Sequence, residues 1–268
     1  MDTIDIGIWG MIGIYSLLLI PITFMWVFKL GLVKETISGT ARMSVQLVFV
    51  GLYLEFIFAL NSWMVNLAWI ALMVVMANIA TLRRANLALR SMFTITVASI
   101  GLSSALVTFF FTAGILKVPP QQARYVIPIL GMILGNCMRG NIISLERFYS
   151  GIRENETEFI TYQLLGASLH EALRPYLRRA INAGMAPYVS TMATMGIVSL
   201  PGMLTGQILG GSLPMTAIKY QIAIMICIFT ASMLASVVNL KASTQVAFDQ
   251  SGMLKQNIFA DESDCFGV

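Results

Sequence analysis

Charged residues are scarce in this sequence: they make up 11% of its 268 residues, while 57% are hydrophobic. Soluble domains carry about 25% charged residues, so this composition excludes an ordinary soluble domain. Histidine occurs once, as His170, and the three cysteines, Cys137, Cys227 and Cys265, lie in separate segments without metal-ligand spacing. The sequence therefore predicts no disulfide framework, and it assigns no metal ligands.

A nucleotide-binding P-loop is also missing, because no G-x-x-x-x-G-K-[ST] pattern occurs. The apolar runs contain no pair of aspartates, no histidine and no cluster of metal ligands. We therefore predict no catalytic residues, no enzyme activity and no cofactor bound by this chain. The formal net charge of +4 does not indicate a nucleic-acid partner, because membrane proteins gather Lys and Arg on their cytoplasmic side.

What is present instead is a series of long apolar runs, close to the roughly 20 residues that a helix needs to cross a bilayer. They predict an all-α, polytopic membrane protein that forms one transmembrane domain over residues 1–268, in contact with lipid. Pro21 lies inside the first run, where we predict a kink. Asp2 and Asp5 stand where a signal peptide has basic residues, so we interpret this run as a retained helix. The seven runs cover residues 6–30, 43–60, 64–82, 92–116, 125–143, 185–211 and 217–240.

The basic residues are distributed unevenly between the two sides of these seven runs. Most Lys and Arg follow the first, third, fifth and seventh runs. By the positive-inside rule, the N-terminus is then outside and the C-terminus is cytoplasmic. This topology predicts a multi-pass protein of the plasma (inner) membrane, in which residues 144–183 form a cytoplasmic segment and residues 241–268 a cytoplasmic tail.

The cytoplasmic segment 144–183 is the one long polar interruption of the chain. Its apolar residues recur at helical spacing on either side of Gly166, which predicts a hairpin of two short helices that bends at this glycine. Ser168 is a predicted N-cap for the second helix, and Glu171, three residues later, completes a capping box.

Two stretches carry a resemblance to a known family. The run LLGASLHEALRPYLRRAI, residues 164–181, resembles the cytoplasmic coupling loop of ABC-transporter permeases, although Ile160, Thr161 and Tyr162 stand where that loop has a Glu-Ala-Ala start. Together with SLPGMLTGQILGG, residues 199–211, it makes the chain similar over essentially all its crossings to the FetB-type permeases, which export iron in bacteria and have relatives in plant aluminium tolerance.

This resemblance implies a permease subunit that exports a small solute, iron or another metal ion, and that is driven by ATP bound to a separate ATPase subunit. It also implies a homodimer of the permease. The residues that it assigns to coupling with the ATPase are Glu158, Gly166, Ala167, Ser168, Glu171 and Arg174.

Three alternatives remain open at this stage. The permease could carry a sugar nucleotide rather than a metal. The chain could also be a secondary carrier driven by ion gradients, but such carriers usually show internal repeats and several intramembrane acids. Finally, the polar hairpin could lie on the lipid surface instead of docking to an ATPase.

Polar side chains within the apolar runs are candidates for a translocation path, because polar groups at membrane depth are costly. Glu55 either binds a cation or reaches the outer interface. Arg139 either lines the path or extends to the cytoplasm, as long basic side chains do near helix ends. The full set of path candidates is Glu55, Asn136, Arg139, Thr205 and Gln207.

Methionine is abundant, with 18 residues. Met192, Met195 and Met203 lie in or beside the predicted path, and thioethers favour soft metals. Scattered methionines more often fill gaps between helices, so packing is the competing interpretation.

Glycines spaced by four residues predict close helix packing, either within the chain or between two copies of it. Pro201, which precedes one such row, is expected to kink its helix or to end a half-helix. The packing candidates are Gly131 and Gly135 in the fifth run and Gly202, Gly206 and Gly210 in the sixth.

Overall fold

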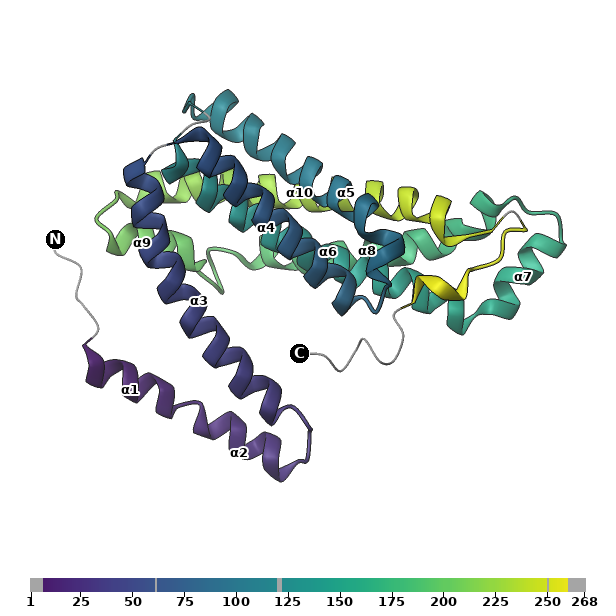
Figure 1. Cartoon of the computed structure of the whole chain (residues 1–268), viewed down its shortest axis with the longest axis horizontal. Helices are drawn as coiled ribbons and strands as arrows, with labels where there is room; N and C mark the ends of the chain where they lie inside the picture. Colours follow the sequence, from purple (N-terminus) through teal and green to yellow (C-terminus); the bar gives the residue numbers. More distant parts are fainter. Residues whose placement is uncertain (1–6, 61, 120–121, 250, 260–268) are drawn as a thin grey trace.

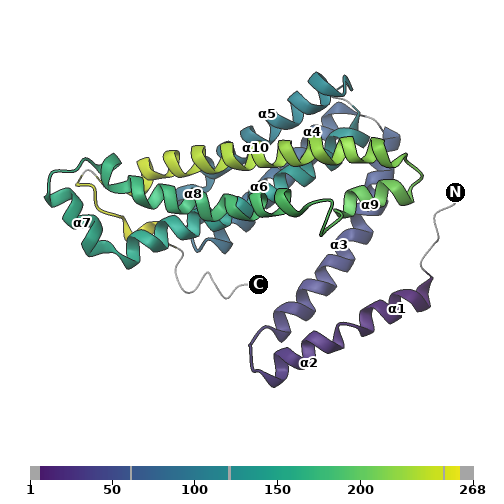
Figure 2. The same cartoon turned by 180° about the vertical axis from the view of Figure 1, so that it is seen from behind.

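The computed structural model describes residues 7–60, 62–119, 122–249 and 251–259, and this part of the chain is helical without any strand (Figure 1). Three long helices, α6, α8 and α10, run along the length of the molecule, and α7 lies at one end (Figure 2). The helices are α1 (Ile8–Ser16), α2 (Leu19–Val27), α3 (Val33–Leu60), α4 (Trp63–Arg84), α5 (Leu89–Phe109), α6 (Ala123–Glu154), α7 (Glu156–Leu164), α8 (Leu169–Thr194), α9 (Gly202–Leu209) and α10 (Pro214–Ala247), with a π-helix η1 (Phe110–Ile115) and a 3-10 helix η2 (Gln256–Ile258).

The predicted class, an all-α polytopic membrane protein, is confirmed. Six segments of the described chain are long and apolar enough to cross a membrane, and they match six of the seven predicted runs. The exception is the sixth run, residues 185–211, which is not one helix. Gly196 takes a φ of +87° just after α8 ends, and Pro201 stands before the first residue of α9. Of the two outcomes expected at Pro201, the structure shows the half-helix.

The first crossing bends where the sequence predicts. α1 and α2 are separated by a turn at Leu17 and Leu18, four residues before Pro21. Proline has no backbone N–H, so the carbonyl of Leu17 loses its usual partner from position 21. The neighbouring Ile22 N–H still donates to the Leu18 carbonyl at 3.1 Å, and the helix resumes. The kink is therefore a local effect of Pro21.

The polar segment 144–183 differs from the predicted pair of short helices. α6 continues through residue 154, because Leu145, Phe148 and Ile152 recur at helical spacing and are all at most 1% exposed. The second helix, α8, has 26 residues and continues into the sixth predicted run. Only α7 is short. α3 likewise begins ten residues earlier than the run at residue 43, so the polar linker before it is helical.

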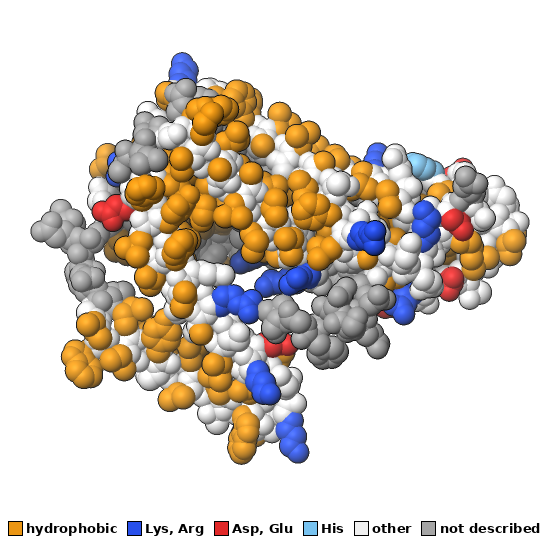
Figure 3. Space-filling view, viewed as in Figure 1, with side chains coloured by type: hydrophobic (Ala, Val, Ile, Leu, Met, Phe, Trp, Pro, Cys, Tyr) orange, Lys and Arg blue, Asp and Glu red, His pale blue; other side chains and the backbone are white. Residues whose placement is uncertain are grey.

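The end of the molecule that carries α7 is its polar end. It consists of α7, the adjoining ends of α6, α8 and α10, and residues 248–259. Figure 3 shows acidic and basic side chains together over this end, whereas hydrophobic side chains cover most of the remaining face. A dense core of its own fills the polar end, with Phe148, Tyr149, Phe159 and Tyr176 among the buried side chains.

A buried polar network ties three long helices together in the middle of the molecule. The Asn239 side-chain amide on α10 donates to Asn141 Oδ1 on α6 at 3.0 Å, and the Thr96 hydroxyl on α5 donates to Asn239 Oδ1 at 3.2 Å. All three side chains are at most 1% exposed. Interhelical hydrogen bonds of this kind fix the register of packed helices in an apolar environment.

The predicted cytoplasmic tail is not a separate polar extension in its first part. Residues 241–247 complete α10, and residues 248–259, which we call the C-terminal strap, fold back over the polar end. The strap pairs Phe259 with Leu87 in the turn between α4 and α5, and the Ala88 N–H donates to the Ile258 carbonyl at 2.8 Å. Ile258 is fully buried. The acidic residues at positions 261, 262 and 264 lie outside the described residues.

Candidate functional site

The hairpin at the polar end, residues 156–174, is called the knuckle below. Its bend is at Gly166, whose φ of +92° lies in the left-handed region that favours glycine. The predicted capping box is confirmed: the Glu171 N–H donates to Ser168 Oγ at 3.4 Å, and the Ser168 N–H donates to Glu171 Oε2 at 2.8 Å. Ser168 Oγ also donates to Glu171 Oε2 at 2.7 Å, and this side-chain hydrogen bond, followed by the one from the Ser168 N–H, lowers the pKa of the Glu171 carboxyl.

α7 is held firmly against the polar end. Phe159 is 1% exposed, with its ring centroid 6.1 Å from that of Tyr176 on α8 and 5.8 Å from that of Phe248 in the C-terminal strap. Glu158 accepts hydrogen bonds from the hydroxyls of Tyr162 at 3.0 Å and Tyr176 at 3.5 Å. The bond and charge of Glu158 raise the pKa of Tyr162, while burial is the main cause that raises the pKa of Tyr176. α7 therefore packs against α8 and the C-terminal strap.

The tip of the knuckle exposes apolar side chains in a polar environment. Leu164 and Leu165 are each 81% exposed, immediately before Gly166. Arg174 is exposed on the first turns of α8, and Ala167 is half-buried at the bend. The structure thus places the six predicted coupling residues within one hairpin. The sequence analysis did not select the two exposed leucines.

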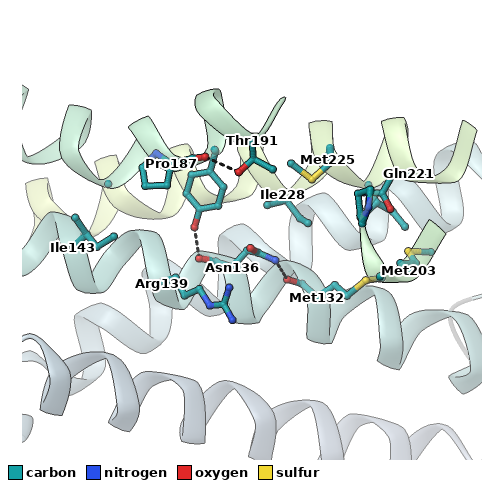
Figure 4. Close-up of a pocket in the computed structure, with 15 residues that line it drawn as sticks. Met132, Asn136, Arg139, Ile143, Pro187, Thr191, Met203, Gln221, Met225 and Ile228 are labelled. Atoms are coloured by element: carbon teal, nitrogen blue, oxygen red, sulfur yellow. Dashed lines mark hydrogen bonds between the residues drawn. The ribbon is translucent and has the colours of Figure 1, made fainter. Parts of the chain in front are cut away.

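A cavity of about 530 Å³ lies between α6, α8, α9 and α10 (Figure 4). Two predicted path residues on α6, Asn136 and Arg139, line it, and α8 closes the opposite side with Tyr188 and Thr191. The Tyr188 hydroxyl donates to the Asn136 carbonyl at 2.5 Å, and the Asn136 side-chain amide donates to the Met132 carbonyl at 2.8 Å. Because the loop before α9 contributes Pro201 to the wall, the break in the sixth predicted run makes room for the cavity.

Gln221 on α10 is a cavity residue that the sequence analysis missed. It is 6% exposed; its Nε2 lies 3.9 Å from Met195 Sδ, and its Oε1 has no hydrogen-bond partner. The rule that polar side chains inside apolar runs are candidates would have selected it, since it lies within the seventh run. Its neighbours in the cavity wall include the thioethers of Met132, Met203 and Met225.

The other three path candidates lie elsewhere. Glu55 is exposed on α3, which does not contribute to the cavity. The Thr205 hydroxyl donates to the Pro201 carbonyl at 3.3 Å within α9. Gln207 Oε1 is buried without a hydrogen-bond partner, outside the cavity wall. Only Asn136 and Arg139 among the candidates are brought together, and the described residues contain no group of three or more His, Cys, Asp or Glu side chains able to hold a metal ion.

The closest helix approach uses glycines outside the predicted set. A Cβ at Gly184 on α8 would overlap Ser144 Oγ and lie 2.8 Å from the Gly140 carbonyl on α6. In the fifth run, a Cβ at Gly131 would lie 3.1 Å from Met73 Cε of α4, so this glycine packs within the chain. Four predicted positions face no other helix: Gly135, Gly202 and Gly206 have nothing within 4 Å of an added Cβ, and Gly210 would meet only the backbone of α9.

Taken together, the fold defines a multi-pass helical membrane protein that has a cavity between its spans and a packed helical extension at one end. Residues 8–248 match the Uncharacterised protein family (UPF0014), and the chain belongs to that family. Its relatives include the UPF0014 membrane protein slr1647 of Synechocystis, which is 36% identical over 88% of this chain and 90% of its own length.

Two further relatives have more specific names. Protein ALUMINUM SENSITIVE 3 of Arabidopsis thaliana is 29% identical, over 87% of this chain and 85% of its own length. The "Probable iron export permease protein FetB" of Escherichia coli is 29% identical, over 78% of this chain and 80% of its own length. No solved structure matches the chain.

Proposed function

We propose that this chain is the permease subunit of an ABC transporter that exports a small solute, with iron or another metal ion as the candidate cargo. ATP is bound and hydrolysed by a separate ATPase subunit, and this chain itself is not an enzyme and binds no cofactor. The relationship to an iron export permease supports the class of cargo. The polar end is then cytoplasmic, in the plasma membrane, with the N-terminus outside.

One observation carries this proposal: the knuckle is joined directly to two of the helices that line the cavity, α6 and α8. α8 begins at the knuckle and reaches the cavity at Gly184, and α6 lines the cavity from Met132 to Ile143 before it ends beside α7. Fifteen residues of α8 separate Leu169 from Gly184, or about 22 Å at the helical rise of 1.5 Å per residue. Because the polar-end core locks α7 to α8, movement of the knuckle is transmitted to the cavity wall.

The knuckle has the form that docking requires. Two exposed leucines at its tip offer an apolar anchor, and an interface anchored by a few apolar side chains in a pocket is the usual source of binding energy. The capping box keeps the start of α8 rigid around this anchor. We assign the docking surface to Leu164 and Leu165, with Arg174 at the rim, and the bend and cap to Gly166, Ala167, Ser168 and Glu171. Glu158 positions α7 through its two tyrosine contacts.

We also propose that two copies of the permease assemble in the transporter. Gly202 and Gly206 on α9 expose their backbone, with nothing within 4 Å, which would let a helix of a second copy approach closely. A secondary carrier is the weaker alternative, since no acidic side chain is among the described residues that line the cavity.

Site-specific photocrosslinking tests the docking of the knuckle. The full chain is expressed with its genomically neighbouring ATPase subunit, and p-benzoylphenylalanine is placed at Leu164. The control position is Ile197, which is equally apolar and 91% exposed but lies in the loop before α9. We expect a crosslink to the ATPase from position 164 and none from position 197. Equal crosslinking from both positions, or none from 164 in an assembled complex, contradicts the proposal.

A further inference from the structure

The cavity between α6, α8, α9 and α10 has an unusual balance of charge for a metal pathway. Arg139 is the one charged side chain among the described residues that line it, and it forms no ion pair within the described part of the chain. No Asp, Glu, His or Cys is among the lining residues. Hard metal cations need oxygen ligands, carboxylates above all, and divalent transition metals favour imidazole, thiolate or carboxylate, whereas the thioethers of the cavity wall suit soft ions such as Cu(I). A bare divalent cation would meet a positive charge and no charged ligand.

The polar groups of the cavity are arranged along its length. Arg139 and Ile143 lie on α6 at the end nearer to the knuckle, and Gln221 and Met203 lie at the other end (Figure 4). Asn136 lies between them on α6. The Gln221 side chain is 94% buried and has an oxygen without a hydrogen-bond partner. Since the two ends of a glutamine amide are interchangeable by rotation, this group can present N–H donors to a ligand.

We propose that the cavity binds its solute as an anion: the Arg139 guanidinium holds a carboxylate or phosphate group of the solute, and the amide of Gln221 binds a polar group of the solute farther along the cavity. A metal ion that uses this route would be carried as an anionic complex. The planar guanidinium matches the two oxygens of a carboxylate or phosphate, and amide donors supply further hydrogen bonds. The inference rests on the proposed permease function, because it names the class of cargo that this cavity takes.

The position of Arg139 also suggests the order of events. Arg139 lies nearer than Gln221 to the end of α6 that reaches the polar end, where a solute enters if the polar end is cytoplasmic. A positive charge at the mouth of a cleft with apolar walls raises the local concentration of anions. Gln221, deeper along the cavity, would then receive the solute. Arg139 acts as the entry group and Gln221 as the inner binding group.

Binding measurements on the purified full chain test this inference. The chain is placed in phosphatidylcholine nanodiscs, and isothermal titration calorimetry is run with citrate, inorganic phosphate, ferric citrate and iron(II) chloride as separate probes. We expect binding of citrate, phosphate or ferric citrate, and no binding of iron(II) alone. Arg139→Gln should weaken anion binding by about tenfold or more, the usual effect of losing a charge-assisted hydrogen bond, and Gln221→Leu should weaken it less.

Two controls make the result specific. Arg90→Gln removes the same charge from an exposed position in the first turn of α5, outside the cavity, and should leave affinity within about twofold, as expected for a screened surface charge. Arg139→Lys keeps the charge without the planar fork and should bind at an intermediate level. Thermal unfolding of each variant in the same nanodiscs separates lost binding from lost structure, and a variant that unfolds early is replaced by Arg139→Lys.

Several outcomes overturn the inference. If iron(II) alone binds, and Arg139→Gln leaves this binding unchanged or strengthens it, the cargo is a cation. If Arg139→Gln and Arg90→Gln weaken anion affinity equally, the effect comes from the net charge of the protein and not from the cavity. If citrate binding disappears in nanodiscs that contain phosphatidylglycerol, the cavity holds a lipid headgroup. Failure of the permease function is detected separately, because crosslinking from position 164 reports on ATPase docking whether or not anions bind.

Discussion

Phe159 is expected to be the residue that makes α7 part of the moving unit. Its ring is 1% exposed and lies between Tyr176 of α8 and Phe248 of the strap. Replacing a buried Phe with Ala costs about 3–5 kcal/mol. α7 has nine residues, and isolated helices shorter than about 12–15 residues are marginal in water. The variant Phe159→Ala should therefore release α7 from the polar end while the spans remain inserted.

The matched control is Leu164→Ala on the same helix. Its side chain is 81% exposed, so truncation removes little packing and should leave α7 folded, but it should weaken docking to the ATPase. Hydrogen–deuterium exchange of residues 156–164, measured by mass spectrometry, separates the two effects. A loss of 3 kcal/mol corresponds to exchange faster by a factor of about 100 or more in Phe159→Ala. Leu164→Ala should exchange at the wild-type rate.

ATP hydrolysis by the assembled complex gives the second readout. Both variants should lower substrate-dependent hydrolysis, Phe159→Ala through a released α7 and Leu164→Ala through a weakened contact. A destabilisation of about 3 kcal/mol corresponds to amide exchange in α7 that is about 100-fold faster. If the exchange rate of α7 in Phe159→Ala stays within about twofold of the wild-type rate, Phe159 does not anchor α7. If Leu164→Ala couples normally, the exposed tip is not the docking anchor.

Three further predictions concern packing, the polar network and the cap. Gly184→Ala places a Cβ against Ser144 and should lower stability by about 1–3 kcal/mol, measured as a lower unfolding midpoint in detergent; Gly206→Ala, which faces open space, should leave a single chain unaffected. Asn239→Leu removes the bonds to Asn141 and Thr96 and should cost about 0.6–1.7 kcal/mol in denaturation by SDS; a neutral effect would show that the network does not stabilise the fold. The folded-state pKa of Glu171 is lowered, so its cap is fully formed above the ordinary carboxylate pKa and is lost as pH falls through the folded value. Amide exchange at the start of α8 should rise over that range of pH, and Glu171→Gln should abolish this dependence.

Six of the seven predicted spans and their helical type were predictable from the sequence, because the signal is length and hydrophobicity alone. Six of the predicted runs match helical segments that are long and apolar enough to cross a membrane. The local features that depend on one or two residues are also confirmed: the first run breaks within a turn of Pro21, and Ser168 and Glu171 form the cap. These features are fixed by backbone chemistry within one turn of helix. They do not require knowledge of which helices are neighbours.

The cavity and the polar end could not be predicted in this way. Gln221 lines the same cavity as Asn136 and Arg139 only because α10 packs beside α6, which no local pattern specifies. The continuation of α6 past residue 144 was missed because its polar surface resembles a loop in composition, although its buried face keeps the helical period. The glycine rows were ambiguous because spacing by four residues indicates a helix face open to close approach, but not which helix packs against it. Tertiary packing decides that Gly184 meets α6 and that Gly131 meets α4.

The C-terminal strap has a consequence for how the protein is made. Leu87 and Ala88 find their partners in Phe259 and Ile258, which the ribosome adds after every crossing has been synthesised. The Ala88 N–H therefore has no Ile258 carbonyl to donate to until the spans described here have been synthesised. A product cut short before residue 258 would keep these spans and lose the contact that ties the turn between α4 and α5 to the C-terminal strap.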